Sequence, residues 1–204
     1  MAKNMSYTHV KKRVILITGT PCVGKTSVAK QLTAKLDALY VNLTELAIMH
    51  DLTIGEDKKR NTTIIDEKKM RIKTAKTIDD TEKTTVIVDA HYAAAIVPKR
   101  YVTRIFVLRR NPIELRKFMK KCGFLDAKLW ENLASEILDV CLVEAVQEHD
   151  DSKVCELDVT GKTVEAIVNE ILAILNENKK CRMDHVDWLG ILEAQGLIDE
   201  YLKV

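Results

Sequence analysis

Short runs of apolar, mostly β-branched residues alternate along the chain with longer stretches in which apolar residues recur at helical spacing. The first run, residues 13–19, predicts a strand, and residues 25–36 predict the helix that follows it. Further strands are predicted at residues 38–42, 85–90, 103–109 and 153–159. Helical spacing covers residues 43–50, 66–80, 111–121, 126–148 and 163–177. This alternation indicates an α/β fold with a five-stranded parallel sheet and helices on both faces.

Two stretches depart from the alternation. Residues 52–63 are rich in charged and polar residues and interrupt what should be a short crossover, so we predict a functional loop there. Residues 184–204 carry apolar side chains at roughly helical spacing among five acids and one lysine, which predicts a short acidic amphipathic helix. Because only three prolines and seven glycines occur, no linker is evident, and residues 1–204 are expected to form a single domain.

Composition narrows the class of protein. Apolar residues make up 47% of the chain and charged residues 30%, a balance typical of a globular protein and not of a disordered one. A formal net charge of +2 argues against general coating of nucleic acid. The five cysteines show no C-x-x-C pair, so neither a disulfide framework nor a zinc site is expected, and a reducing, cytoplasmic location fits. No apolar run is long enough to predict a membrane span.

One motif carries most of the chemical information. It reads Gly19-Thr20-Pro21-Cys22-Val23-Gly24-Lys25-Thr26 and matches G-x-x-x-x-G-K-[ST] between a predicted strand and a predicted helix. Successive backbone N–H groups of such a loop bind phosphate at the positive end of a helix, and the lysine adds a point charge. Thr26 supplies a hydroxyl for Mg²⁺. The motif therefore predicts ATP binding, with Lys25 as a catalytic cation.

A second constellation ends the strand at residues 85–90. Asp89 and His91 lie two positions apart and share one face of the chain. Ligands of doubly wound sheets bind outside the carboxyl ends of the strands. We therefore expect Asp89 to order Mg²⁺ together with Thr26, and His91 to approach the γ-phosphate. A helix cap for Asp89 and a surface position for His91 are the simpler alternatives.

Basic residues cluster at several places, and most such runs are solvated surfaces. Arg109 and Arg110 are the exception, because they end a predicted central strand. There a guanidinium could meet phosphate oxygens as charge moves during transfer, so we assign Arg109 a catalytic role, with Arg110 as the alternative.

Several of these features together resemble a known family. The phosphate loop, the Asp89-x-His91 pair, Val107-Leu-Arg109 and the helix at residues 129–137 are similar to an adenylate kinase family shared by archaea and eukaryotes, where it is called adenylate kinase isoenzyme six. The resemblance implies a nucleoside-monophosphate kinase fold, transfer of phosphate from ATP to AMP, and some ATPase activity. It also implies a role in maturing the small ribosomal subunit, with a ribosomal protein and the pre-ribosomal particle as partners.

The resemblance also places parts of the nucleotide site. Positions that match the family's nucleotide-binding set are Gly19, Cys22, Gly24, Lys25, Thr26, Ser27 and Cys122. The monophosphate-binding segment would be residues 42–70 and a short lid residues 121–129. The family usually has a glycine at position 22 and begins its lid with Arg-Gly-aromatic, whereas this chain has Cys22 and reads Cys122-Gly-Phe124. Phe118 also stands where an arginine is expected.

These residues are compatible with three functions: a monophosphate kinase, an ATPase switch for ribosome assembly, and a nucleotide-dependent binding module. They share the phosphate loop and differ in what accepts the γ-phosphate. Acceptor-dependent formation of ADP is the observation that separates them.

Replacing Lys25 by methionine should abolish ATP turnover with the fold intact. The loss of the cation that bridges the β- and γ-phosphates removes several kcal/mol, about 3 or more, of transition-state stabilisation. Steady-state kinetics measures the effect, and circular dichroism is the control for folding. Turnover within about threefold of the unsubstituted protein would rule out the assignment of the loop.

Overall fold

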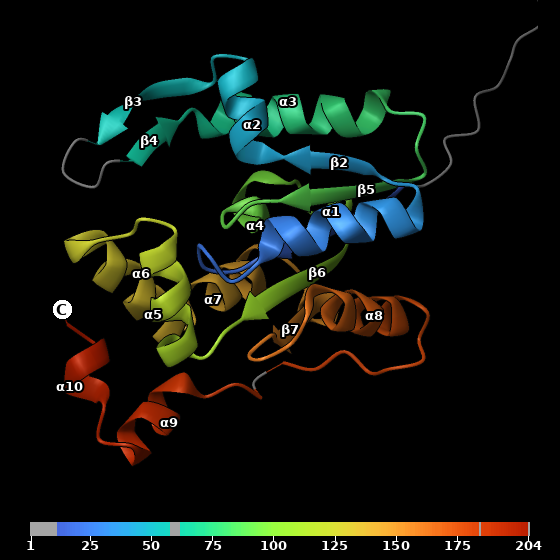
Figure 1. Cartoon of the computed structure of the whole chain (residues 1–204). Coiled ribbons are helices and arrows are strands. Elements are labelled where there is room, and N and C mark those ends of the chain that lie inside the picture. Colours follow the sequence, from blue (N-terminus) through green and yellow to red (C-terminus); the bar gives the residue numbers. More distant parts are fainter. Residues whose placement is uncertain (1–11, 58–61, 184, 204) are drawn as a thin grey trace, which may run out of the picture.

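The computed structural model describes residues 12–57, 62–183 and 185–203, and Figure 1 shows their arrangement. The strands are β1 (Arg13–Thr18), β2 (Leu39–Asn42), β3 (Thr53–Asp57), β4 (Thr62–Ile65), β5 (Thr85–Asp89), β6 (Val102–Arg109) and β7 (Val154–Asp158). The helices are α1 (Lys25–Leu36), α2 (Leu43–Met49), α3 (Glu67–Asp80), α4 (Ala93–Ile96), α5 (Pro112–Lys121), α6 (Asp126–Ile137), α7 (Val140–Glu148), α8 (Val164–Leu175), α9 (Trp188–Ala194) and α10 (Ile198–Tyr201), with a 3₁₀ turn at Asp151–Lys153.

The main sheet has five strands in the order β2-β5-β1-β6-β7, and every neighbouring pair is parallel. β1 lies at the centre, with Ile17 level with Asp89 on one side and Phe106 on the other. The predicted five-stranded parallel sheet is confirmed. In this order the loop after β1 and the residue that ends β5 open at the same edge of the sheet.

Alternate residues of each strand pack against different helical layers. Ile15 and Ile17 of β1 join a core cluster with residues of α1 and α8, whereas Val14 and Leu16 join a second cluster with residues of α3, α4 and α7. All four side chains are fully buried. Burial on both faces explains why the strands are continuous apolar runs and do not alternate with polar residues.

The predicted helix at residues 126–148 is wrong in one respect, because it is two helices. α6 ends at Ile137, and Asp139 takes a left-handed conformation with φ 58° before α7 begins. The apolar spacing continues across the break, so periodicity could not reveal it. The turn lets α7 pack against α4 and β6 while α6 packs on α5.

Residues 52–63 were expected to form a loop, and the described part of this stretch is instead mostly strand. β3 and β4 pair as an antiparallel hairpin, and residues 58–61 lie outside the described residues. The hairpin is joined to the sheet by α2 and α3, whose first turns are capped by the side chains of Asn42 and Asp66. Figure 1 shows the hairpin projecting at the same end of the molecule as the turn between α5 and α6.

The C-terminal segment forms two short helices where one was predicted. Trp188 and Leu192 of α9 and Tyr201 of α10 are buried, and the two helices pack on α6. Position 184 lies outside the described residues. The tail is therefore packed against α6, the helix that contains the end of the predicted lid.

The expectation that the cysteines form no disulfide is wrong for one pair. Cys155 of β7 is bonded to Cys181, with a Cα–Cα distance of 5.2 Å. The chain after α8 returns beside β7, where the Glu156 N–H donates to the Arg182 carbonyl at 2.8 Å. The partners are 26 residues apart, a spacing without a recognisable motif, so only the return of the chain brings them together.

In the described parts of the chain, no helix combines the length and the apolar character that crossing a bilayer requires.

Replacing Thr74 by valine should stabilise the protein by about 1 kcal/mol. The Thr74 side chain is fully buried in α3, and its hydroxyl has no hydrogen-bond partner. Valine keeps the shape and removes the unpaired polar atom, whose burial is unfavourable. Urea denaturation measures the change. Thr33→Val is the matched control, because the Thr33 hydroxyl donates to the Ala29 carbonyl at 2.7 Å and its loss should destabilise. Lower stability of Thr74→Val would contradict the assignment.

Candidate active site

The loop between β1 and α1 has the backbone shape that a phosphate cradle needs. Gly19 has φ 130°, and a Cβ there would lie 2.3 Å from the Leu108 carbonyl oxygen, so only glycine fits. Gly24 has φ 108° and precedes the first turn of α1. Cys22, where the family usually has glycine, also takes a left-handed conformation with φ 68°. The cysteine therefore keeps the loop's path at a modest cost in strain, about 1 kcal/mol.

Lys25 lies at the start of α1 with its side chain turned back over the loop. Its Nζ donates to the Thr20 carbonyl at 2.9 Å. Desolvation lowers the pKa of Lys25, and the nearby thiol of Cys141 and carboxylate of Asp89 oppose the shift. The ammonium group is held in the hollow of the loop, where a nucleotide phosphate would replace the carbonyl as its partner.

Asp89, which is 1% exposed, ends β5 and gathers three donors on its Oδ2 atom. The Thr26 hydroxyl lies at 2.7 Å, the Tyr40 hydroxyl at 2.9 Å and the Asn42 amide nitrogen at 3.2 Å. Thr26 and Asp89, predicted to share a metal ion, are therefore in direct contact. Helix capping of Asp89 is not what the structure shows.

Tyr40 and Asn42 were missed as site residues by the sequence analysis. Both come from the carboxyl end of β2, which pairs with β5 so that Asn42 is level with Asp89. Burial raises the pKa of Tyr40 to about 12, so its hydroxyl stays protonated as a donor. Their spacing of two on an expected strand places both side chains on one face, which is the clue that could have identified them.

His91 follows β5 in a turn whose backbone is held in place. Its carbonyl accepts a hydrogen bond from the Thr18 hydroxyl at 2.9 Å, and its ring packs edge-on against Tyr92 with centroids 4.8 Å apart. Desolvation, with the positive charges of Lys25 and Lys128, lowers the pKa of His91 to about 4. The imidazole is therefore neutral near pH 7, although His91 is an exposed residue, as the alternative of a surface position expected.

The geometry contradicts the expectation that Arg109 is free to meet phosphate. Its side chain is buried and makes ion pairs with Glu136 at 2.9 Å, with Glu156 at 2.6 Å and with Asp139. The surrounding carboxylates raise the pKa of Arg109 against the effect of desolvation. The guanidinium holds β6, β7, α6 and the start of α7 together, so its role is structural.

Arg110, the alternative weighed for the same role, does lie against the phosphate loop. One guanidinium nitrogen donates to the Val23 carbonyl at 3.2 Å, another pairs with Glu114, and the buried Nε has no partner. The guanidinium lies over the Phe118 ring, with its carbon 4.7 Å from the centroid. Phe118, which stands where an arginine was expected, thus packs against a neighbouring arginine.

The remaining predicted positions lie around the loop. Thr26 and Ser27 are exposed in the first turn of α1. Cys122 begins the turn from α5 to α6, within the predicted lid, and neighbours Cys22. Burial, reinforced by Cys122, raises the pKa of Cys22 to about 12, so that this thiol is protonated near neutral pH.

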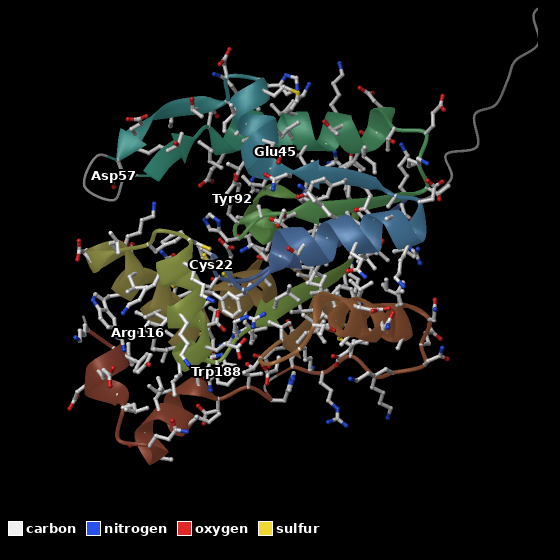
Figure 2. The ribbon with its side chains drawn as sticks, viewed as in Figure 1. Cys22, Glu45, Asp57, Tyr92, Arg116 and Trp188 are labelled. Carbon is white, nitrogen blue, oxygen red and sulfur yellow. A yellow bond between two sulfur atoms is a disulfide. The ribbon has the colours of Figure 1, made fainter. Side chains whose placement is uncertain are left out.

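A cavity of about 500 Å³ opens beside His91. Its walls come from α2, from the β3–β4 hairpin, from the turn after β5 and from α6, and they include Thr44, Ile64, Tyr92 and Lys128. Figure 2 shows Tyr92 between Glu45 of α2 and Cys22 of the phosphate loop. The predicted monophosphate segment, residues 42–70, supplies most of the lining. A second cavity of about 380 Å³, beside β7 and α8, is separate from these residues.

Known proteins are similar to this chain in sequence or in fold. A family model described as an AAA domain matches residues 15–139. A protein of Pyrococcus furiosus named "Putative adenylate kinase" is 38% identical over 192 residues, covering 94% of this chain and 98% of the relative. A protein of the same name from Methanocaldococcus jannaschii is 37% identical over 174 residues, covering 85% and 92%. Shikimate kinase from Acinetobacter baumannii has the same fold, with a TM-score of 0.58 at 13% identity over 82% of this chain and 95% of that one.

The phosphate loop on a five-stranded parallel sheet defines a P-loop fold, and the relatives named as kinases place the chain among P-loop kinases. The chain belongs to the family of its archaeal adenylate kinase relatives. The family resemblance noted from the motifs is thereby confirmed.

The His91 ring should remain neutral in the folded protein from pH 8 down to about pH 5, because its pKa is lowered to about 4. An unfolded chain binds this proton near pH ~6.5, so the histidine's contribution to stability falls as the pH drops from about 6.5 towards 4. NMR titration of the ring protons tests this, with His91→Gln used for assignment. A titration midpoint near 6.5 would contradict the description of the site.

Proposed function

We propose that the protein transfers the γ-phosphate of ATP to AMP and forms two molecules of ADP. The observation that carries the proposal is the cavity beside His91, lined largely by residues 42–70 and next to the phosphate loop. Its volume of about 500 Å³ is in the range of small-molecule sites. The relatives' name supports AMP as the acceptor.

The residues of the loop divide the work of holding ATP. Backbone N–H groups of Cys22 to Thr26 cradle the phosphates, and Lys25 exchanges the Thr20 carbonyl for the β- and γ-phosphates. Arg110, rather than Arg109, is positioned to support the phosphate side of the loop. The segment predicted to be a lid, residues 121–129, starts near the loop, because Cys122 neighbours Cys22.

Thr26 and Asp89 suit a magnesium ion. A hydroxyl and a carboxylate 2.7 Å apart are hard oxygen ligands, and both lie at the edge of the sheet where the strands have their carboxyl ends. The described residues contain no cluster of three acids, cysteines or histidines that would hold a metal alone, so phosphate oxygens and water would complete the coordination. Bound there, Mg²⁺ would neutralise charge on the phosphates during transfer.

The proposed reaction requires no proton transfer by the protein. An oxygen of the AMP phosphate attacks the γ-phosphorus, that new bond forms as the bond to the β-phosphate oxygen breaks, and ADP leaves. The attacking oxygen is already anionic, so no general base is needed. A neutral His91 fits this requirement, because it can donate a hydrogen bond to the γ-phosphate without taking a proton.

ATP hydrolysis is the second candidate activity. A neutral imidazole beside the γ-phosphate can orient an attacking water, and because its lowered pKa makes it a weak base, the proton of that water would pass to a phosphate oxygen or to solvent. The role in small-subunit maturation, with a ribosomal protein and the pre-ribosomal particle as partners, is implied by the family resemblance and stays a prediction.

The experiment compares ADP formation from ATP alone with that from ATP plus AMP, CMP or UMP. Lys128 is a cation in the described lining of the cavity beside His91, so Lys128→Met should raise the KM for AMP about tenfold and the KM for ATP much less. Lys117→Met, which removes one exposed charge from α5, is the matched control, and Lys128→Arg should restore much of the affinity. Turnover independent of every monophosphate would favour the ATPase switch over the kinase.

A further inference from the structure

Glu136 of α6 is a buried carboxylate that no part of the proposed reaction uses. It is 1% exposed, yet hydrogen-bond donors from distant parts of the chain converge on it. The donors are the Thr20 hydroxyl at 2.6 Å from Oε2, and the Arg109 Nε at 2.9 Å, the Arg110 backbone N–H at 3.0 Å and the Trp188 Nε1 at 3.0 Å from Oε1. One acid therefore connects the phosphate loop, the end of β6 and the C-terminal segment.

Thr20 is held from two sides at the middle of the loop. Its hydroxyl donates to Glu136, and its carbonyl accepts from the Lys25 ammonium at 2.9 Å. The side chain is 1% exposed although the loop belongs to no helix or strand. A continuous path of hydrogen bonds thus runs from the indole of Trp188 through Glu136 and Thr20 to Lys25.

Trp188 makes a polar contact in addition to its packing in the core. It is 4% exposed at the first position of α9, and a buried indole N–H is unfavourable unless it finds an acceptor. The acceptor is on the helix that carries Glu136 and not on α9 itself. In Figure 2 the loop residue Cys22 lies between Tyr92 on one side and Trp188 on the other, so the C-terminal segment approaches the loop from the side away from the cavity.

We propose that Glu136 is a positioning residue for the phosphate loop and that the C-terminal segment, through Trp188, completes the nucleotide site. Glu136 holds the Thr20 side chain. This contact fixes the position of the Thr20 carbonyl, which accepts a hydrogen bond from Lys25. When ATP takes Lys25 from that carbonyl, the hydroxyl of Thr20 keeps the loop in place. The inference rests on nucleotide binding at this loop and does not depend on which acceptor is phosphorylated.

The variants that test the proposal leave the buried ion pairs intact. Replacing Glu136 itself would remove a counter-charge of Arg109 and endanger folding. Thr20→Val removes only the hydroxyl, and Trp188→Phe removes only the indole N–H and part of the ring. Thr74→Val and Trp130→Phe are matched controls, because Thr74 is as buried as Thr20 and Trp130 is a tryptophan of α6 that packs under Arg116 and Lys203 and, within the described residues, makes no hydrogen bond to Glu136.

Both test variants should lower kcat/KM for ATP by about 5- to 20-fold, with the controls within about twofold. The double variant Thr20→Val/Trp188→Phe is decisive. Because both residues act through Glu136, its loss should be clearly smaller than the product of the two single losses. A loss equal to that product, or single variants that behave like their controls, would overturn the proposal.

A second measurement needs no catalysis. The chain has two tryptophans, so Trp130→Phe leaves Trp188 as the one fluorescent indole. Saturating ADP, with binding verified by calorimetry, should change the emission of Trp188, and adding Thr20→Val should remove most of that change while ADP still binds. Emission that is unaltered with ADP bound would overturn the proposal. Absence of acceptor phosphorylation would refute the kinase but leave this result unaffected.

Discussion

The guanidinium of Arg109 and its three carboxylates are the interaction on which the rest of the structure depends. Glu136, Glu156 and Asp139 come from α6, β7 and the turn before α7, and Arg109 itself ends β6. Burying the charges of Arg109, Glu136 and Glu156 is unfavourable unless they are paired, so β6, α6 and β7 must meet in one arrangement. Asp139, which is partly exposed at the break between α6 and α7, adds a third ion pair and ties that turn to the end of β6.

The phosphate loop lies between two acids with different tasks. Asp89 stands on one side and takes donors from Thr26, Tyr40 and Asn42, in the position where a metal ion would be held. Glu136 stands on the other and is occupied by structural donors. One acid can therefore exchange its partners for a ligand, whereas the other keeps the loop in the shape that the ligand meets.

The site contains groups for positioning and charge neutralisation and needs no activated nucleophile. Burial and Cys122 keep the Cys22 thiol protonated, and His91 is neutral because its surroundings disfavour a further positive charge. These are the groups expected at a site for phosphoryl transfer between nucleotides, because the reacting oxygens belong to the nucleotides. The cavity formed by α2, the hairpin and α6 offers space for the acceptor on the side of His91.

The sequence by itself determined the parallel sheet, the phosphate loop and the placement of Lys25, Thr26, Asp89 and His91, because each depends on local pattern and on which end of a strand a residue follows. Only the tertiary structure distinguished Arg109 from Arg110, since Arg109 ends β6 among carboxylates of α6 and β7, whereas Arg110, the next residue, reaches the Val23 carbonyl of the phosphate loop. The same holds for the disulfide of Cys155 and for the contact of Trp188 with Glu136. These contacts join residues far apart in the chain, and their spacing carries no periodic pattern; they exist because burial of the cluster at the end of β6 brings the surrounding elements together.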